Sequence, residues 1–197
     1  MRKKIIADVT EHNNMMNGLM DACLKPLEKI ADTILRTLKE KHKLIVFGNG
    51  GSAADAQHFV CELVGSFRNK NRRALPAIAL TTNTSNLTSI SNDFGYDEVF
   101  KRQVEALAQK GDLCIGISTS GRSPNVYKAL AAAKKIGCKT ATLLGNDGGI
   151  IKKIADCSVI VPSDSTPRIQ EAHILIIHIL CAIVDEAFSK KNGRLIT

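Results

Sequence analysis

The sequence predicts an α/β fold, a three-layer αβα sandwich with a central five-stranded parallel sheet and an N-terminal helical segment. Short apolar runs of strand length alternate along the chain with stretches of helical apolar spacing. This alternation is typical of βαβ units and a parallel sheet. Hydrophobic residues make up 44% of the chain but aromatic residues only 4%, so the core must be largely aliphatic. Right-handed crossovers then place helices on both faces of the sheet.

The chain of 197 residues fits a single domain. An N-terminal helical segment is expected over residues 1–42, where apolar residues recur at helical spacing, and the α/β core over 43–197. Pro26 interrupts the helical pattern. It predicts either the end of one helix and the start of a second, or one kinked helix.

The strands of the core are expected at five short apolar runs. In chain order, these runs cover residues 44–48, 77–81, 113–118, 140–144 and 158–162. Continuous apolar character is typical of strands that are buried on both faces. Helices are expected at about residues 53–67, 124–136 and 167–188. No element is assigned to residues 82–112.

The composition excludes several classes of protein. No apolar stretch is long enough to span a membrane, and no signal sequence follows the basic N-terminus, so we expect a cytoplasmic protein without a membrane partner. The six cysteines never occur at C-x-x-C spacing, which predicts buried free thiols and no thiolate zinc site.

The net charge of +8 raises the question of a nucleic-acid partner. The Lys and Arg residues are dispersed, and the densest run, residues 68–73, is interpreted as a solvated loop. We therefore expect no nucleic-acid partner. A basic balance also suits an enzyme that collects small phosphorylated substrates.

The first candidate binding loop is Gly-Asn-Gly-Gly-Ser at residues 48–52, directly after the first strand. Its glycines allow a ligand to approach the backbone closely. Ser52 is expected to cap the following helix, whose free N–H groups and positive dipole end favour an anion. The pattern is neither G-x-G-x-x-G nor a Walker A loop, so we expect no nucleotide cofactor.

The second candidate loop is Ser-Thr-Ser-Gly-Arg-Ser-Pro at residues 118–124. Ser123 occupies a natural N-cap position and Pro124 the first helical position. Such residues also form turns with no ligand. At the carboxyl end of a strand in an open α/β sheet, where ligands bind, a phosphate cradle without a metal is favoured. A third turn, residues 145–149, is interpreted as a plain turn.

Two helices carry candidate acid and base residues. His58 and Glu62 are four positions apart and project from one face. Gln170 and His178 lie about 80° apart around the last helix and can share a broad face, whereas His173 and His178 lie about 140° apart and are not expected to serve one site. The alternatives are an interfacial hydrogen bond for His58 with Glu62, and a core or interface histidine for His178.

These parts match the requirements of an aldose–ketose isomerase. One base must carry a proton between adjacent carbons through an enediol, and a second group must open the sugar ring and manage the oxygen protons. Glu and His fill these roles when burial tunes their pKa values. A hydroxyl-rich phosphate site would hold the far end of the sugar.

Four motifs then occur in a characteristic order, at residues 48–58, 91–95, 116–121 and 168–174. Together they resemble the phosphoheptose isomerases of the sugar isomerase (SIS) superfamily, over nearly the whole chain. The resemblance implies a single SIS domain with the flavodoxin-like SIS fold over residues 1–197. It also implies a homotetramer with sites built between subunits.

The resemblance further implies conversion of sedoheptulose 7-phosphate to D-glycero-D-manno-heptose 7-phosphate, for lipopolysaccharide or capsule heptose. Glu62 would be the enediol base and His178 its acid/base partner. Substrate contacts would come from Asn49, Gly50, Gly51, Ser52, Glu62, Asn92, Asp93, Ser118, Thr119, Ser120, Ser123 and Gln170. Zinc is implied as a metal, with His58, Glu62, Gln170 and His178 as ligands. Two imidazoles and a carboxylate suit zinc, whereas the amide is a weak ligand.

The chain departs from the family pattern at two positions. Ser66 replaces an Arg found in many members, for which Arg68 offers partial compensation, and Pro167 replaces an Asp found in some. Two alternative functions follow from the superfamily. A non-catalytic tetramer that binds a replication initiator protein would lack the Glu and the final His that this chain has. A sugar-phosphate-sensing regulator would need a DNA-binding domain, and residues 1–42 offer no clear helix-turn-helix.

Overall fold

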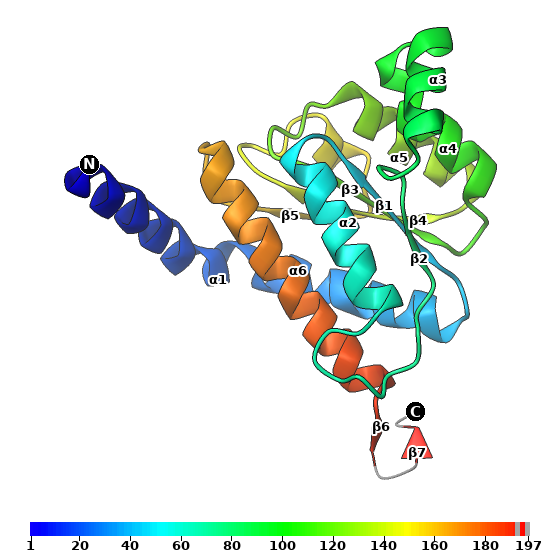
Figure 1. Ribbon diagram of the computed structural model, residues 1–197, viewed down its shortest axis with the longest axis horizontal. Helices are drawn as coiled ribbons and strands as arrows, with labels where there is room; N and C mark the ends of the chain where they lie inside the picture. The colour runs from blue at the N-terminus through cyan, green and yellow to red at the C-terminus, as the bar shows by residue number, and fades with distance from the viewer. Residues whose placement is uncertain (192–193, 196–197) are drawn as a thin grey trace.

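The computed structural model describes residues 1–191 and 194–195 and confirms the α/β sandwich (Figure 1). The central sheet is parallel, with the strand order β2-β1-β3-β4-β5 that is typical of flavodoxin-like folds. Its strands are β1 (Leu44–Gly48), β2 (Ala77–Ala79), β3 (Leu113–Ser118), β4 (Lys139–Leu144) and β5 (Cys157–Ile160). All five lie at the predicted runs, although β2 is shorter than predicted.

Helices cover both faces of the sheet because its strands are apolar on both faces. The helices are α1 (Arg2–Lys39), α2 (Gly51–Val64), α3 (Thr84–Phe94), α4 (Val99–Leu107), α5 (Pro124–Ile136) and α6 (Thr166–Phe188). Leu44 and Val46 of β1 belong to the core under α1, α2 and α6, whereas Ile45 and Phe47 belong to the core under α4 and α5.

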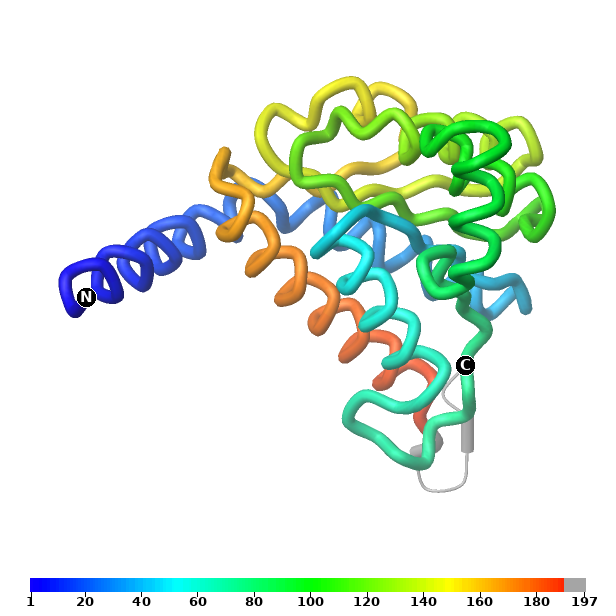
Figure 2. Tube along the Cα trace, turned by 45° about the horizontal axis from the view of Figure 1, so that its top comes forward, coloured from blue at the N-terminus to red at the C-terminus, as the bar shows by residue number. Residues whose placement is uncertain are grey.

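The N-terminal segment is one helix that continues through Pro26. The prediction of two helices is therefore wrong and the single-helix alternative holds. Buried residues from Met15 to Leu38 pack this helix against the sheet and α6. Its first turns are exposed and extend away from the body of the molecule (Figures 1 and 2).

Four features between and after the predicted elements were not predicted from the sequence. α3, the 3₁₀ turn η1 (Tyr96–Glu98) and α4 follow β2. β6 (Lys190–Lys191) and β7 (Arg194–Leu195) form a short antiparallel pair after α6. α3 has no buried residue. Its Thr, Ser and Asn residues are typical of loops, because their side chains form hydrogen bonds with nearby backbone groups that compete with those of a helix.

Two helices define the region of the candidate site. α2 and α6 lie side by side over one face of the sheet (Figures 1 and 2). They run in the same direction, because Gly51 at the start of α2 contacts Gln170 near the start of α6, while His58 meets His178 further along. Side chains on their facing surfaces are therefore brought together two turns from the loops.

The basic run at residues 68–73 is mostly exposed, as the sequence interpretation expects, but Arg72 is an exception that corrects it. Arg72 is only 5% exposed and pairs with Asp185 of α6. The six cysteines are free; Cys61 is exposed, Cys157 is half-buried and the others are buried. Among the described residues, no helix combines the length and apolar character needed to cross a bilayer.

Candidate active site

Three of the predicted catalytic and metal-binding side chains meet between α2 and α6. His58 Nε2 lies 3.1 Å from His178 Nε2 and 3.4 Å from Glu62 Oε1. The His58 side chain is 41% exposed and that of Glu62 only 19% exposed. The i, i+4 spacing on α2 therefore produces the predicted shared face, and α6 supplies the third member from a distant part of the chain.

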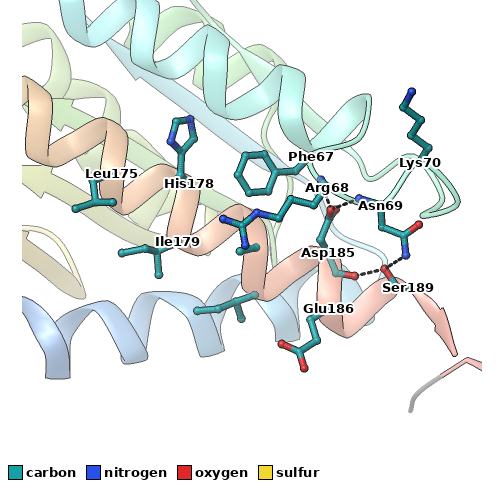
Figure 3. Close-up of a pocket in the computed structure, with 12 residues that line it drawn as sticks. Phe67, Arg68, Asn69, Lys70, Leu175, His178, Ile179, Asp185, Glu186 and Ser189 are labelled. Carbon is teal, nitrogen blue, oxygen red and sulfur yellow. Dashed lines mark hydrogen bonds between the residues drawn. The ribbon is translucent and has the colours of Figure 1, made fainter.

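The His178 ring is held from both sides. Its centroid lies 5.1 Å from that of His58, with the rings tilted by 55°. On the other side it stacks on Phe67, with centroids 5.5 Å apart and an interplanar angle of 23°. His178 and Phe67 line a groove of about 950 Å³ together with other residues of α6 and of the loop after α2, and Figure 3 shows the side chains that line it. This volume is large enough for a small ligand.

His173 takes a different environment from His178, as its position on α6 predicted. Its ring is buried and Nε2 donates to the Leu144 carbonyl, 3.1 Å away. Burial lowers its pKa to about 4, against the opposing effect of that hydrogen bond. His173 is therefore a neutral core residue.

The candidate phosphate loop lies between β3 and α5. Ser118 Oγ and Ser123 Oγ are 3.0 Å apart, and Ser120 Oγ accepts a hydrogen bond from Arg122 N at 3.2 Å. Ser123 is the N-cap residue and Pro124 opens the helix, as predicted, although the Ser123 side chain makes no capping hydrogen bond. Its hydroxyl instead faces Ser118, so two predicted phosphate ligands lie next to each other at a helix N-terminus.

The first glycine loop is tied to the start of α5. Asn49 and Asn125 exchange two amide hydrogen bonds of 2.9 Å, and Tyr96 Oη donates to Asn49 Oδ1 at 3.2 Å. The expected capping role of Ser52 is wrong, because α2 already begins at Gly51 with Gly50 as its N-cap, and Ser52 is buried. The helix reaches this far because Gly50 adopts a φ of 55°, which glycine tolerates without strain.

Three other predicted substrate-binding residues lie apart from the histidine pair. Gln170 packs its amide against Gly51, where any Cβ would collide with it. Asn92 and Asp93 are exposed near the end of α3 and bond to each other at 2.8 Å. Within the described part of the chain, neither Asn92 nor Asp93 has a side-chain hydrogen bond to any predicted site residue beyond this pair.

The acidic turn at residues 145–149 is more than a plain turn. Gly121 of the phosphate loop has a φ of +64°, and a Cβ there would collide with the backbone of Gly148. Gly121 O also accepts a hydrogen bond from Ile151 N at 3.0 Å, and Asn146 Nδ2 donates to Thr119 O at 3.0 Å. This turn therefore buttresses the phosphate loop.

Asp55 is a candidate functional residue that the sequence reading missed. It precedes His58 by three positions on α2 and is half-buried, and its Oδ2 has no hydrogen-bond partner among the residues that the structure describes. Burial raises its pKa to about 6, and the charge of His58 acts in the opposite direction. The signal was available in the sequence, because positions 55, 58 and 62 share one helical face.

The donor set between α2 and α6, two imidazoles and a carboxylate, is of the chemical kind that zinc uses. Tetrahedral coordination with Zn–N bonds of 2.0–2.1 Å places two ligand nitrogens about 3.3 Å apart. The observed separations of 3.1 Å between the imidazole nitrogens and 3.4 Å to the Glu62 oxygen are close to this value. Among the described residues, no group of three or more His, Cys, Asp or Glu side chains is placed so that it could hold a metal ion without a change of side-chain position. Gln170, the fourth predicted ligand, lies at Gly51 instead.

The catalytic group and the loops are not in direct contact within one chain. Glu62 follows Gly51 by eleven positions on α2, which corresponds to about 16 Å along the helix axis. Glu62 therefore lies far from the glycine loop in a single subunit. Two separate groups of candidate residues result, the side chains between α2 and α6 and the loops that follow β1 and β3.

Comparisons with known proteins identify the family of the chain. The SIS domain family model matches residues 9–145. Phosphoheptose isomerases from Geobacter sp. (strain M21) and Aliarcobacter butzleri are 53% and 52% identical to this chain, covering 98% and 96% of it and 100% of each relative. The solved phosphoheptose isomerase GmhA from Neisseria gonorrhoeae superimposes with a TM-score of 0.89 at 41% identity, over 94% of this chain and 98% of that one.

The fold, the paired loops and the family match define a SIS-domain protein. Its sequence identity to relatives over their full length identifies a narrower family than the domain match alone does. The chain belongs to the phosphoheptose isomerase family, and it is an isomerase.

Proposed function

We propose that this chain interconverts sedoheptulose 7-phosphate and D-glycero-D-manno-heptose 7-phosphate, with Glu62 as the base and His178 as its partner. The observation that carries the proposal is the meeting of Glu62, His58 and His178 between α2 and α6. The names of the relatives supply the substrate class. A non-catalytic SIS-fold module that binds a replication initiator protein, or a sugar-phosphate-sensing regulator, has no specific observation in its favour.

The chemistry follows from the side chains. Glu62 removes a proton from C1 of the open-chain ketose, and the electron pair moves to form the enediol. The same carboxyl returns the proton to C2, while His178 moves a proton between the two oxygens so that the C1 carbonyl forms. Such proton transfers contribute about 10² to 10⁴ in rate. Ser118, Thr119, Ser120 and Ser123 hold the phosphate and fix the sugar along the groove.

We further propose that His58, Glu62 and His178 can hold zinc, with Gln170 as a fourth ligand after a change of its side-chain position. When bound, the ion would act as a Lewis acid toward a carbonyl oxygen. The residues of the chain still bind the phosphate, orient the sugar and carry the protons. His58 then has a positioning role through its contacts with both other side chains.

A homotetramer with sites between subunits is also proposed. The groove beside His178 is lined by apolar side chains of α6, and Leu175 is 39% exposed there. Ile5, Ile6 and Val9 are exposed on the part of α1 that extends from the body (Figure 1). A second copy would cover both surfaces. It would also bring the anion-binding loops of one subunit toward the acid/base residues of another.

The direct test is incubation of the purified protein with sedoheptulose 7-phosphate and NMR detection of the aldose product. We expect the anomeric signals of the heptose 7-phosphate to appear and to reach an equilibrium mixture. In deuterated water the product should carry deuterium at C2, because an enediol base exchanges its proton with solvent. Unchanged substrate after long incubation with concentrated enzyme would reject the proposed function.

A further inference from the structure

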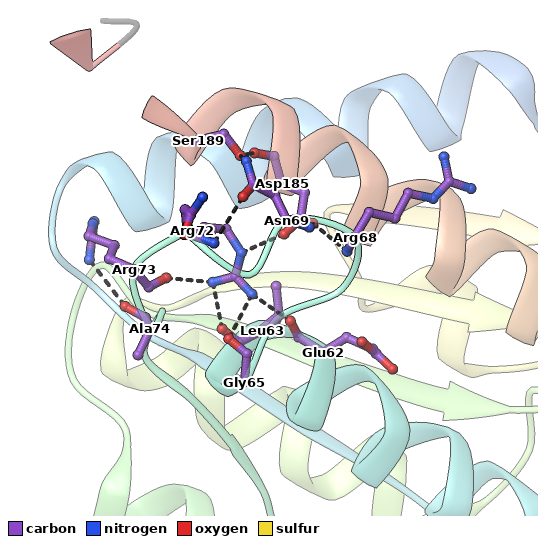
Figure 4. A network of polar contacts seen from close by, with 11 residues as sticks. Glu62, Leu63, Gly65, Arg68, Asn69, Arg72, Arg73, Ala74, Asp185 and Ser189 are labelled. Atoms are coloured by element: carbon purple, nitrogen blue, oxygen red, sulfur yellow. Dashed lines mark hydrogen bonds and ion pairs between the residues drawn. The ribbon is translucent and has the colours of Figure 1, made fainter. Parts of the chain in front are cut away.

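The loop that follows α2 is organised around one buried guanidinium. Arg72 Nε donates to Asp185 Oδ1 at 2.5 Å. The remaining four N–H groups have main-chain acceptors: the carbonyls of Leu63, Arg73, Glu62 and Gly65, at 2.9, 2.6, 2.6 and 3.3 Å. Figure 4 shows this arrangement. An arginine has five N–H donors, so every donor of Arg72 has a partner.

Three of these acceptors, the carbonyls of Glu62, Leu63 and Gly65, lie at the end of α2. The last carbonyls of an α-helix have no partner within the helix, and a cation there also interacts favourably with the helix dipole. Arg72 therefore acts as a side-chain cap for α2. One of the peptide groups that it holds is that of Glu62, the proposed base.

Asp185 connects the same loop to α6. Besides Arg72, it accepts hydrogen bonds from the backbone N–H groups of Arg68 at 2.6 Å and Asn69 at 2.9 Å. Burial alone would raise the pKa of this carboxyl, but the N–H groups of Asn69 and Arg68 and the Arg72 guanidinium lower it. Asp185 lies two turns after His178 on the same helix.

The held segment carries the proposed base and one of the two rings that contact His178. Glu62 stands at its beginning, and Phe67, which stacks on the His178 ring, stands in its middle. The Arg72–Asp185 pair thus bridges the helix of the base and the helix of its partner. A shift of the loop would move Glu62 and Phe67 together relative to His178.

We propose that Arg72 and Asp185 are positioning residues that fix the distance and orientation of Glu62 relative to His178. This inference rests on the proposed function of Glu62 and His178. Stability alone does not account for such a pair, because replacing a buried ion pair with apolar residues is often neutral or stabilising. Misplacement of a reacting group by about 1 Å can cost about 10²-fold in rate, so a role in positioning gives the pair a function that apolar residues lack.

The chain offers a matched control at the amino ends of β1 and β3. Asp112 is buried and, like Asp185, accepts two backbone N–H groups, from Lys43 at 3.0 Å and Gln109 at 2.8 Å, and one cation, Lys43 Nζ at 2.5 Å. It has no contact with Glu62, His58 or His178 among the described residues. Asp112→Asn therefore removes an equivalent buried charge away from the site.

The test compares Arg72→Lys, Asp185→Asn and Asp112→Asn in the full-length protein. Arg72→Lys keeps the charge but cannot hold five acceptors. We expect Arg72→Lys and Asp185→Asn to lower kcat by about 10- to 100-fold with KM changed less than threefold. Asp112→Asn should lose a similar amount of thermal stability and keep the wild-type kcat. The pH–rate profile should shift in the first two variants only.

A readout without activity separates this inference from the proposed function. In wild-type protein, the ring protons of His178 should show an NMR shift caused by the stacked Phe67 ring, identified by its loss in Phe67→Leu. Arg72→Lys and Asp185→Asn should reduce that shift and Asp112→Asn should not. If the wild type has no isomerase activity but these shifts behave as stated, the proposed function fails and the positioning of the two helices stands.

If Arg72→Lys or Asp185→Asn fails to fold, a double variant still tests the positioning role. The double variant Arg72→Met/Asp185→Leu removes both charges and leaves neither unpaired, so it is expected to fold. It should show the same loss of kcat and of the His178 ring shift. Wild-type kcat and an unchanged His178 shift in any folded variant of the pair would overturn the inference.

Discussion

His58 and His178 face each other with their Nε2 atoms 3.1 Å apart, although the two residues are 120 positions apart along the chain. At this distance one imidazole donates and the other accepts, because a neutral imidazole has one N–H and one free nitrogen. The pair is a point at which a proton, or a cation, can be shared between α2 and α6. The predictions on proton transfer and on zinc binding below depend on this pair.

The first prediction concerns the base. Glu62→Gln keeps the shape of the side chain but removes its basicity, so kcat should fall by about 10² to 10⁴ while calorimetry still detects substrate binding. His178→Gln should be comparably damaging. Glu105→Gln, on the exposed face of α4, serves as the control and should leave kcat unchanged. Near wild-type turnover in Glu62→Gln would contradict the mechanism and favour a non-catalytic binding module.

The second prediction concerns the phosphate loop. Thr119→Ala and Ser123→Ala should raise KM by about tenfold, because each removes a hydrogen bond to a charged group that is present in both ground and transition states. The change in kcat should be small. Steady-state kinetics and competition by inorganic phosphate measure both effects, with Ser89→Ala on the exposed part of α3 as the control. An unchanged KM in both variants would place the phosphate elsewhere.

The third prediction concerns zinc. Protein purified without chelators should contain about one zinc ion per chain, and His58→Gln should lose it, because the ion would need both imidazoles and the carboxylate. His42→Gln, beside Asp112 at the opposite edge of the sheet, should keep it. Elemental analysis gives the zinc content of each variant, and isomerase activity is measured before and after chelation. A metal-free preparation that remains fully active would exclude a required metal.

The fourth prediction concerns assembly. Light scattering should give the mass of a tetramer, and Leu175→Glu should shift it toward smaller species, because a charge in the apolar α6 surface opposes burial between subunits. Ile150→Glu, at another exposed apolar residue, should leave the mass unchanged. A stable wild-type monomer would be incompatible with sites shared between subunits.

The fifth prediction concerns pH and His173. Its folded-state pKa of about 4 lies below the ordinary value of 6.5, so the unfolded chain binds the proton more readily. The stabilisation is fully present above pH 6.5 and is lost as pH falls toward 4, by up to about 3 kcal/mol from this residue. His173→Gln retains a donor for the Leu144 carbonyl and should lose less stability than wild type between pH 7.5 and 5.0 in urea unfolding. Equal losses would show that His173 does not titrate in this range.

The sequence predicted the sheet because its strands are continuous apolar runs, and Leu113–Ser118 and Pro124–Ile136 were located to the residue. It could not predict α3, whose Thr-, Ser- and Asn-rich helix buries no residue. A polar helix of this kind leaves no periodic apolar signal.

The candidate site was likewise predicted where its geometry depends on local spacing, and was not predicted where it depends on distant parts of the chain. The face shared by His58 and Glu62 follows from local spacing and was predicted. The burial of Arg72 depends on Asp185, 113 positions away, and the Asn49–Asn125 amide pair spans 76 positions. Side-chain partners at such separations are set by tertiary packing, and a basic run read alone looks like solvated loop.

The contact between Gly121 and the turn at Gly148 and Gly149 limits how this loop can evolve. Each glycine has a positive φ, and a side chain at Gly121 or Gly149 would collide with the backbone of the other loop. A single replacement at Gly121 or Gly149 is therefore blocked from two sides, by its own conformation and by its neighbour. Substitutions that change the anion preference of the loop can therefore occur at its Ser and Thr residues. The backbone of the two glycine turns that carries these residues must be conserved together.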